Sequence, residues 1–231
     1  CETNKNRAGY FAMLYYRVTC KVRDCIKNKD FDNGERMERL DVAFANHYLQ
    51  AFYLWIDGKP TSLSWKIAFD SVSDNSCLVL QHLLLGMNAH INFDLGIATQ
   101  YIMKGLDIEE IHNDYNTING ILGSMIASVE EGLSKINPLM PLLRLDIFKI
   151  DDMLVNFSII IARDGAWTFA KELSGITGNA FETSVKARDQ SISILGISIA
   201  KPKGLLLKIV VSIIRVFDKK NVSRTIQFLG N

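Results

Sequence analysis

The chain has 231 residues, of which 48% are apolar and 22% are charged, the composition of an ordinary globular protein with one large core. Its 26 basic and 25 acidic side chains leave a formal charge of +1, which gives no overall field to attract nucleic acid, and we expect no nucleic-acid partner. No uninterrupted apolar run reaches the about 18 residues that a membrane-spanning helix needs.

The amino terminus and the cysteines bear on where the protein resides. The chain begins at Cys1 rather than at methionine, so it is either a piece whose start is missing or a mature lipoprotein with a lipid-bearing cysteine. We favour the missing start, because the polar run at residues 2–6 is too short for a lipoprotein tether before the helical pattern begins at Arg7. The four cysteines show no Cys-x-x-Cys or zinc-ribbon spacing, and no export segment is visible, which together predict a reducing, cytoplasmic location.

Apolar residues recur at spacings of three and four along almost every segment, which predicts amphipathic helices joined by short connections. Residues 73–76 are expected to cap a central helix, which can continue to about Lys104 with Gly96 as its only internal weak point. A loop is expected at 107–113. The expected helices span residues 9–26, 35–56, 64–72, 78–104, 115–136, 150–173, 180–200, 205–217 and 221–229.

These segments predict an all-α, single-domain bundle of about eight helices around a buried central helix, covering residues 1–231 and lacking the start of its first helix. The burial follows from residues 78–95, where leucines and isoleucines leave no side that faces solvent. Each residue of a helix turns by about 100°, so polar residues four apart form a stripe. The first stripe comprises His82, Gly86, His90 and Asp94, and a second one beside it comprises Gln81, Asn88 and Asn92.

The first stripe predicts a metal site, because imidazole and carboxylate are standard ligands of zinc, iron and manganese. His90 and Asp94 are the strongest pair, since side chains at i and i+4 can reach one ion. His82 lies two turns, about 12 Å, before His90. One ion can therefore bind all three only if the helix bends near Gly86, unless the histidines serve two ions or only one of them is a ligand. A further ligand would come from the second helix, from His47 or Asp41.

Two other interpretations of the central helix stay open. Buried histidines and asparagines in a bundle are often hydrogen-bonded to their neighbours, and such a network fixes the packing without any chemistry. The helix could also line a metal-free acid–base or ligand pocket. In a catalytic interpretation, Asn88 and Asn92 would orient the ligands or hold substrate. Arg163 is the third candidate catalytic residue, although an ion pair with the adjacent Asp164 is the stronger expectation for it.

The segment from Leu205 to Phe217 carries a different signal. Lys208, Ser212, Arg215 and Lys219 form a basic stripe against a wide apolar face. This pattern is typical of a bundle helix that faces the core, and it also fits a helix in weak contact with a membrane surface. We favour the bundle helix.

Several segments carry a resemblance to a known family. Residues 80–95 read Leu-Gln-His-Leu-Leu-Leu-Gly-Met-Asn-Ala-His-Ile-Asn-Phe-Asp-Leu, and they resemble the string LQHLLLGMNAHINxDL that marks an uncharacterised, mainly bacterial family of domains of unknown function. Shorter matching segments lie at residues 7–12, 16–19, 36–41, 44–48, 65–69, 156–159 and 162–164. The resemblance implies no established reaction. It also implies further helix before Arg7, in agreement with a missing start.

Two functions follow from these patterns. The first is a metal-dependent hydrolase in which a bound divalent ion activates water, since the chain has no serine or cysteine nucleophile motif. A weak similarity supports it: zinc-dependent phospholipase C and related helical nucleases hold metal through a His-x-x-x-Asp step, which only His90 and Asp94 match. The alternative is a non-catalytic ligand-binding or scaffold domain whose polar helix is a structural core network. The partner would be a small molecule or none, and the oligomeric state is open.

Overall fold

The computed structural model describes residues 1–139, 159–203, 205–218 and 221–230, and within these ranges the chain consists of helices and turns without a strand. The all-α class predicted from the sequence is therefore confirmed, and the described part of the chain forms ten α-helices where about eight were expected. The helices are α1 (Ala8–Lys27), α2 (Gly34–Ile56), α3 (Leu63–Asp70), α4 (Val79–Ala89), α5 (Leu95–Ile102), α6 (His112–Ile136), α7 (Ile159–Ser174), α8 (Gly178–Ala200), α9 (Leu205–Phe217) and α10 (Val222–Gly230).

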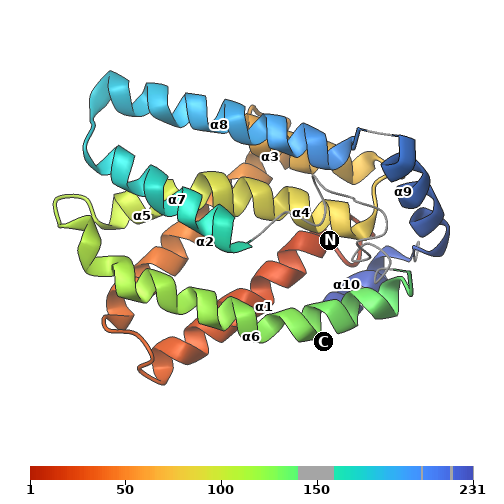
Figure 1. The fold of residues 1–231 in the computed structure, drawn as a ribbon, viewed down its shortest axis with the longest axis horizontal. Coiled ribbons are helices and arrows are strands. Elements are labelled where there is room, and N and C mark those ends of the chain that lie inside the picture. Colours follow the sequence, from red (N-terminus) through yellow and green to blue (C-terminus); the bar gives the residue numbers. More distant parts are fainter. Residues whose placement is uncertain (140–158, 204, 219–220, 231) are drawn as a thin grey trace.

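The helices pack as a bundle around the rod formed by α4 and α5 (Figure 1). In this view α8 runs along one long side of the bundle and α6 along the other, while α9 closes one end. α7 packs on α5, and α3 and α8 both pack on α4. α2 passes behind α5 and α7 in the view of Figure 1 and contacts α5 directly. The rod is therefore enclosed by helices from most parts of the chain.

The largest apolar cluster lies where α1, α2 and α3 meet α4. Its aromatic members are Phe11, Tyr48, Trp65 and Phe69, and they pack against the leucines of the central helix. Local signals in the sequence fix the helices that carry these rings. Asn33 caps α2 by accepting a hydrogen bond from the Arg36 amide, and α3 begins at the cap residue Ser62. The rings therefore converge on the buried polar helix, where the candidate site lies.

The central helix is buried as predicted, but its geometry differs from the expected regular helix to Lys104. Residues His90–Asp94 form a π-helical turn between α4 and α5, and α5 ends at Ile102. Gly96 marks a close contact between two helices rather than a weak point of the central helix. A Cβ at this position would lie 2.7 Å from Phe169 Cδ1 and 2.9 Å from the Ala166 carbonyl oxygen, so the glycine allows α7 to pack directly on α5.

The caps and ends of several other elements also differ from the expectation. The central helix is not capped by residues 73–76, because the side chain of Gln81 accepts a hydrogen bond from the Leu78 amide and Asp218 accepts one from the Val79 amide. The expected loop at 107–113 is a short 3₁₀ turn followed directly by α6, which begins at His112. The predicted start of the helix at 150–173 lies outside the described residues, and α7 begins at Ile159.

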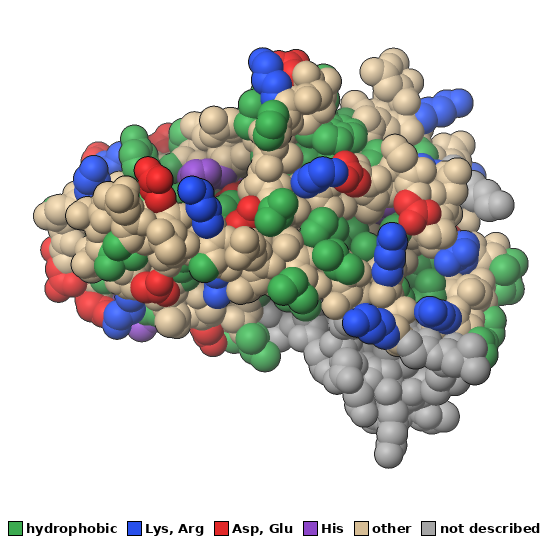
Figure 2. Space-filling view, turned by 90° about the horizontal axis from the view of Figure 1, so that it is seen from above, with side chains coloured by type: hydrophobic (Ala, Val, Ile, Leu, Met, Phe, Trp, Pro, Cys, Tyr) green, Lys and Arg blue, Asp and Glu red, His purple; other side chains and the backbone are tan. Residues whose placement is uncertain are grey.

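The surface agrees with the balanced composition. Figure 2 shows basic and acidic side chains interspersed over the face that it views, without a large area of one sign. None of the described helices combines the length and the apolar character needed to cross a membrane. Cys1, Cys20, Cys25 and Cys77 are all free thiols. The cytoplasmic location stays a prediction.

Candidate functional site

The π-helical turn carries a hydrogen-bonded pair of side chains, His90 and Asp94. The Nδ1 atom of His90 lies 3.1 Å from Oδ2 of Asp94, and the indole Nε1 of Trp65 donates to the same carboxyl oxygen at 2.8 Å. His90 and Asp94 are each only 2% exposed. Turns of this kind recur at functional sites, because the inserted residue changes the direction in which side chains point. The two residues selected by their i, i+4 spacing therefore contact each other, and the hydrogen bond from Trp65 joins α3 to the central helix.

Aromatic rings surround the imidazole of His90. The Phe44 ring stacks on it with a centroid separation of 3.5 Å, and the Tyr15 ring meets it edge-on at 4.5 Å. Phe11, Tyr48 and Trp65 complete the enclosure at centroid distances of 5.7, 6.1 and 5.9 Å. These rings come from α1, α2 and α3, and spacing within one helix does not indicate which histidine they enclose.

Burial controls the protonation of the pair. It holds the pKa of His90 well below the usual value, and the nearby His47 adds to this effect. Burial also raises the pKa of Asp94 well above the usual value, although the Trp65 hydrogen bond opposes the shift. Burial therefore favours the uncharged form of both groups. In the arrangement that satisfies both contacts, the imidazole Nδ1–H and the indole N–H donate to Oδ2, which leaves His90 Nε2 as an acceptor.

The Nε2 atom of His90 is buried and has no hydrogen-bond partner among the described residues. An imidazole held at Nδ1 by a carboxyl group, with Nε2 free, is the arrangement found at many metal and acid–base sites. Here, however, aromatic rings cover the imidazole. The arrangement therefore has the parts of a reactive histidine, but no substrate or ion reaches it in this conformation.

His82 occupies a separate environment. Its Nδ1 lies 3.3 Å from the Ser71 hydroxyl, which itself donates to the Ala68 carbonyl at 2.6 Å, so Nδ1 must be the donor to Ser71. Burial, aided by the charge of Arg7, lowers the pKa of His82 to about 4. His82 Nε2 is thus a second buried acceptor without a partner among the described residues.

A small cavity adjoins His82 and not His90. It has a volume of about 20 Å³, lies between α1, α2, α3 and α4, and is bordered by Arg7, Phe11, Trp65 and Gly86 among others. This volume holds about one water molecule. The central helix does not bring the two imidazoles to a common space, since His82 points to this cavity and His90 to the rings of Phe44 and Tyr15.

The α2 residues considered as further ligands lie at the edge of the site. His47 is half-buried, and burial lowers its pKa. Asp41 is also half-buried, and burial raises its pKa to about 6. His47 is near enough to His90 to disfavour a charge on it. α2 therefore contributes two ionisable side chains to the edge of the site, and burial disfavours the charged form of each.

The predicted catalytic residues take part in hydrogen bonds that connect helices. Asn92 Nδ2 donates to Asn88 Oδ1 at 3.0 Å, and Asn88 Nδ2 donates to the Ile192 carbonyl of α8 at 3.0 Å. Arg163 Nε donates to Asn119 at 2.6 Å, and its guanidinium stacks over the Tyr115 ring. The two asparagines thus connect α4 to α8, and Arg163 connects α7 to α6, rather than surrounding His90.

The donor set does not fit a metal centre as it is arranged. In the ranges that the structure describes, no three His, Cys, Asp or Glu side chains gather where an ion could bind. Oδ2 of Asp94 is already occupied by Trp65 and His90. Metal binding by His82, His90, Asp94 and His47 stays a prediction, and these contacts would have to rearrange for it to occur.

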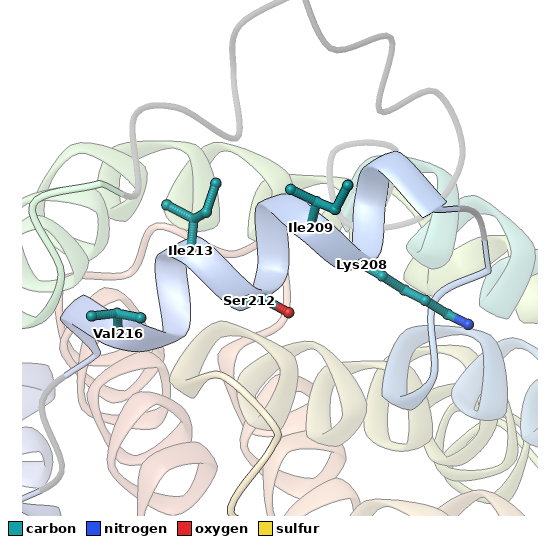
Figure 3. Close-up of a pocket in the computed structure, with 5 residues that line it drawn as sticks. All are labelled: Lys208, Ile209, Ser212, Ile213 and Val216. Carbon is teal, nitrogen blue, oxygen red and sulfur yellow. The ribbon is translucent and has the colours of Figure 1, made fainter.

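A shallow hollow of about 350 Å³ lies on the outer face of α9. Figure 3 shows the five side chains that line it, Lys208, Ile209, Ser212, Ile213 and Val216, all from this one helix. The opposite face of α9 buries Val211 and Ile214 in the core, as predicted for a bundle helix. Weak membrane-surface contact through the outer face stays a prediction, and Lys219 lies outside the described residues.

Comparison with known proteins places the chain in a family without assigning an activity. No curated protein and no solved structure matches it. A family model described as a family of unknown function, DUF5995, matches residues 1–202 of the 231. The match covers α1 to α8 and therefore the whole candidate site. The chain belongs to the DUF5995 family.

Proposed function

We propose that the protein is a non-catalytic scaffold domain, in which the polar central helix is a structural hydrogen-bond network. One observation carries the proposal: the polar side chains of this helix are used to bind its neighbours. Gln81 donates to the Ile199 carbonyl at 2.8 Å, Asn88 donates to the Ile192 carbonyl, and Asp94 accepts from Trp65. α3 and α8 are thereby fixed in register on the central helix.

The energetic logic favours such a network. A buried polar group that loses its partner costs about 1–3 kcal/mol, so a wrong register of α8 would leave two carbonyls and two amides unpaired. Apolar packing alone tolerates sliding between helices more readily. The enclosure of His90 by rings points the same way, because a catalytic group has to touch its substrate.

The proposal is tested by a double-mutant cycle on Trp65 and Asp94. Trp65→Phe keeps a ring and removes the N–H, and Asp94→Leu removes the acceptor. We expect each single variant to lower the free energy of unfolding by about 1–3 kcal/mol and the double variant to lose less than the sum, because the Trp65–Asp94 hydrogen bond can be lost only once. The His90 Nδ1 atom loses its partner equally in Asp94→Leu and in the double variant, so this loss cancels in the cycle. Strictly additive losses in urea unfolding would contradict the network.

A metal-dependent hydrolase is the second candidate, favoured by the free Nε2 of His90 with Asp94 at Nδ1. Elemental analysis of untagged protein purified without chelator separates the two candidates. The scaffold proposal expects no stoichiometric zinc, iron or manganese, and His90→Ala and His82→Ala variants that differ from the parent only in stability. Near-stoichiometric metal that is lost in His90→Ala would overturn the scaffold proposal and justify a screen for hydrolase activity.

A further inference from the structure

α2 exposes a second apolar face, which the described residues do not cover. Its inner face buries Met37, Leu40, Tyr48 and Ala51 in the core. On the outer face, four large apolar side chains are each between 41% and 61% exposed. These side chains are Val42, Leu49, Tyr53 and Ile56. Isolated exposed apolar residues are common, but four along one face of one helix form a continuous stripe.

The stripe has the spacing of a coiled-coil seam. Val42, Asn46, Leu49, Tyr53 and Ile56 follow one another at steps of four, three, four and three residues, which are the alternating d and a positions of a heptad. Asn46 is exposed and occupies an a position between apolar residues. The pattern is therefore that of a helix prepared to meet another helix.

We propose that this face pairs two copies of the chain through an antiparallel α2–α2 contact. In antiparallel pairs, each a residue lies in a layer with a d residue of the other helix. A single register then places Val42 opposite Tyr53 and Asn46 opposite Leu49, and each of these layers occurs twice about the two-fold axis. Arg39, at the preceding a position, meets Ile56 in the same register. The face is thus complementary to itself.

Charge complementarity at the ends selects the antiparallel second copy as the occupant. The register brings Arg39 of one copy next to Asp57 at the end of α2 of the other copy. Both side chains are exposed, and Asp57 also pairs with Lys59 of its own chain at 3.0 Å. A parallel pair would instead set Arg39 against Arg39, which is repulsive.

The length of the seam sets the expected strength. Fourteen residue steps from Val42 to Ile56 span about 21 Å of helix. One helix pair of this length buries less than the about 1,200–2,000 Å² of a standard interface. We therefore expect a reversible dimer with a dissociation constant on the order of micromolar rather than nanomolar.

Sedimentation velocity over a range of concentrations tests the interface. The parent chain is expected to shift from monomer to dimer as its concentration rises through the micromolar range. Leu49→Glu should remain monomeric at concentrations where the parent is dimeric, with an unchanged unfolding temperature in dilute solution. Ile194→Glu on α8 replaces a side chain that is also exposed and should dimerise like the parent. A parent chain that is monomeric at every concentration, or a Leu49→Glu variant that still dimerises, would overturn the proposal.

Charge exchange tests the orientation. Arg39→Asp should weaken dimerisation about three- to tenfold, because it faces Asp57 of the other copy in both symmetry-related positions. Combining Arg39→Asp with Asp57→Arg should restore the parent affinity in an antiparallel pair. In addition, mixing Val42→Cys with Tyr53→Cys protein should give disulfide-linked heterodimers. Efficient cross-linking of Val42→Cys with itself, or no recovery in the charge-exchanged double variant, would show that the antiparallel register is wrong.

Discussion

At the scale of single residues, the two buried histidines differ from ordinary core residues because each keeps one nitrogen without a partner among the described residues. The spacing of His90 and Asp94 placed both side chains on one side of the helix, where they lie 3.1 Å apart, whereas their predicted role as metal ligands stays a prediction. It could not predict Trp65 as the second donor to Asp94, because Trp65 lies 29 residues away along the chain. Nor could it separate the surroundings of His82 from those of His90, since the residues that enclose each ring come from other helices.

The depressed pKa of His82 predicts acid sensitivity. The unfolded chain binds a proton near the ordinary pKa of 6.5, whereas the folded protein does so only near 4, so the unfolded state carries more protons between these values. Stability should therefore fall as the pH drops from 6.5 towards 4, by up to about 1.4 kcal/mol for each pH unit. His82→Gln should lose less stability than the parent over this range, measured by urea unfolding at each pH.

The effect of Asp41 on the pH dependence of stability has the opposite sign, and Asp41 therefore serves as a control. Burial raises its pKa to about 6 from an ordinary value of 3.8, so the folded protein binds more protons between these values and gains stability as the pH falls. An Asp41→Asn variant should lose this gain and become more acid-sensitive than the parent. If His82→Gln showed the same pH dependence as the parent, the burial of His82 in the folded state would be contradicted.

The close packing at Gly86 predicts that a single added methyl group destabilises the central helix. A Cβ at this position would lie 2.3 Å from Phe11 Cγ and 2.8 Å from Phe11 Cβ, so the ring that covers both the small cavity and His90 has to move. Gly86→Ala should cost about 1–3 kcal/mol in urea unfolding. Gly120→Ala in α6 is the matched control, because nothing lies within 4 Å of its Cβ and helix propensity alone should stabilise it by about 0.5–1 kcal/mol. Equal effects at the two sites would contradict the close contact.

At the scale of elements, periodicity predicted the existence of the described helices better than it predicted their ends. Helix existence depends on apolar spacing within the segment, which the sequence contains. The π-helical turn at His90–Asp94 and the start of α6 at His112 depend on neighbours from other segments, such as the Trp167 ring that stacks on His112 at 4.6 Å. Local pattern carries no information about such partners.

The difference between local and distant partners can be tested at the cap of α4. The sequence favoured residues 73–76 as the cap. In the structure, the Val79 amide instead donates to the carboxylate of Asp218 at 2.9 Å, and Asp218 lies near the other end of the chain. Asp218→Ala should therefore lower the free energy of unfolding by about 1 kcal/mol, with a further loss because Asn137 also donates to this carboxyl group. Asp74→Ala, at the position favoured by the sequence, should cost less. The reverse order in thermal unfolding would restore the local cap.

At the scale of the whole molecule, the family match ends at residue 202, but the packing continues into α9 and α10. Arg17 of α1 donates to the Leu229 carbonyl at 2.9 Å, and a Cβ on Gly9 of α1 would lie 2.6 Å from Ile226 Cδ1. Val222, Ile226 and Leu229 are buried in a cluster with residues of α1, α4 and α6. The single domain stays a prediction, and it is supported by this continuity, since the described residues of α10 share a core with α1, α4 and α6.

Removal of residues 203–231 tests that continuity. Uncovering Val222, Ile226 and Leu229 from the shared cluster forfeits about 1.5–3 kcal/mol for each side chain, and losing the Asp218 cap adds to this. The sum approaches the about 5–15 kcal/mol that stabilises a typical domain, so the shortened chain should fail to show a cooperative transition in calorimetry. Ile226→Ser in the full chain should lower the unfolding temperature strongly, whereas Ile213→Ser on the exposed face of α9 should not. If the shortened chain unfolded cooperatively at the parent temperature, α9 and α10 would be an appendage, and residues 1–202 alone would contain the folding unit that the family match outlines.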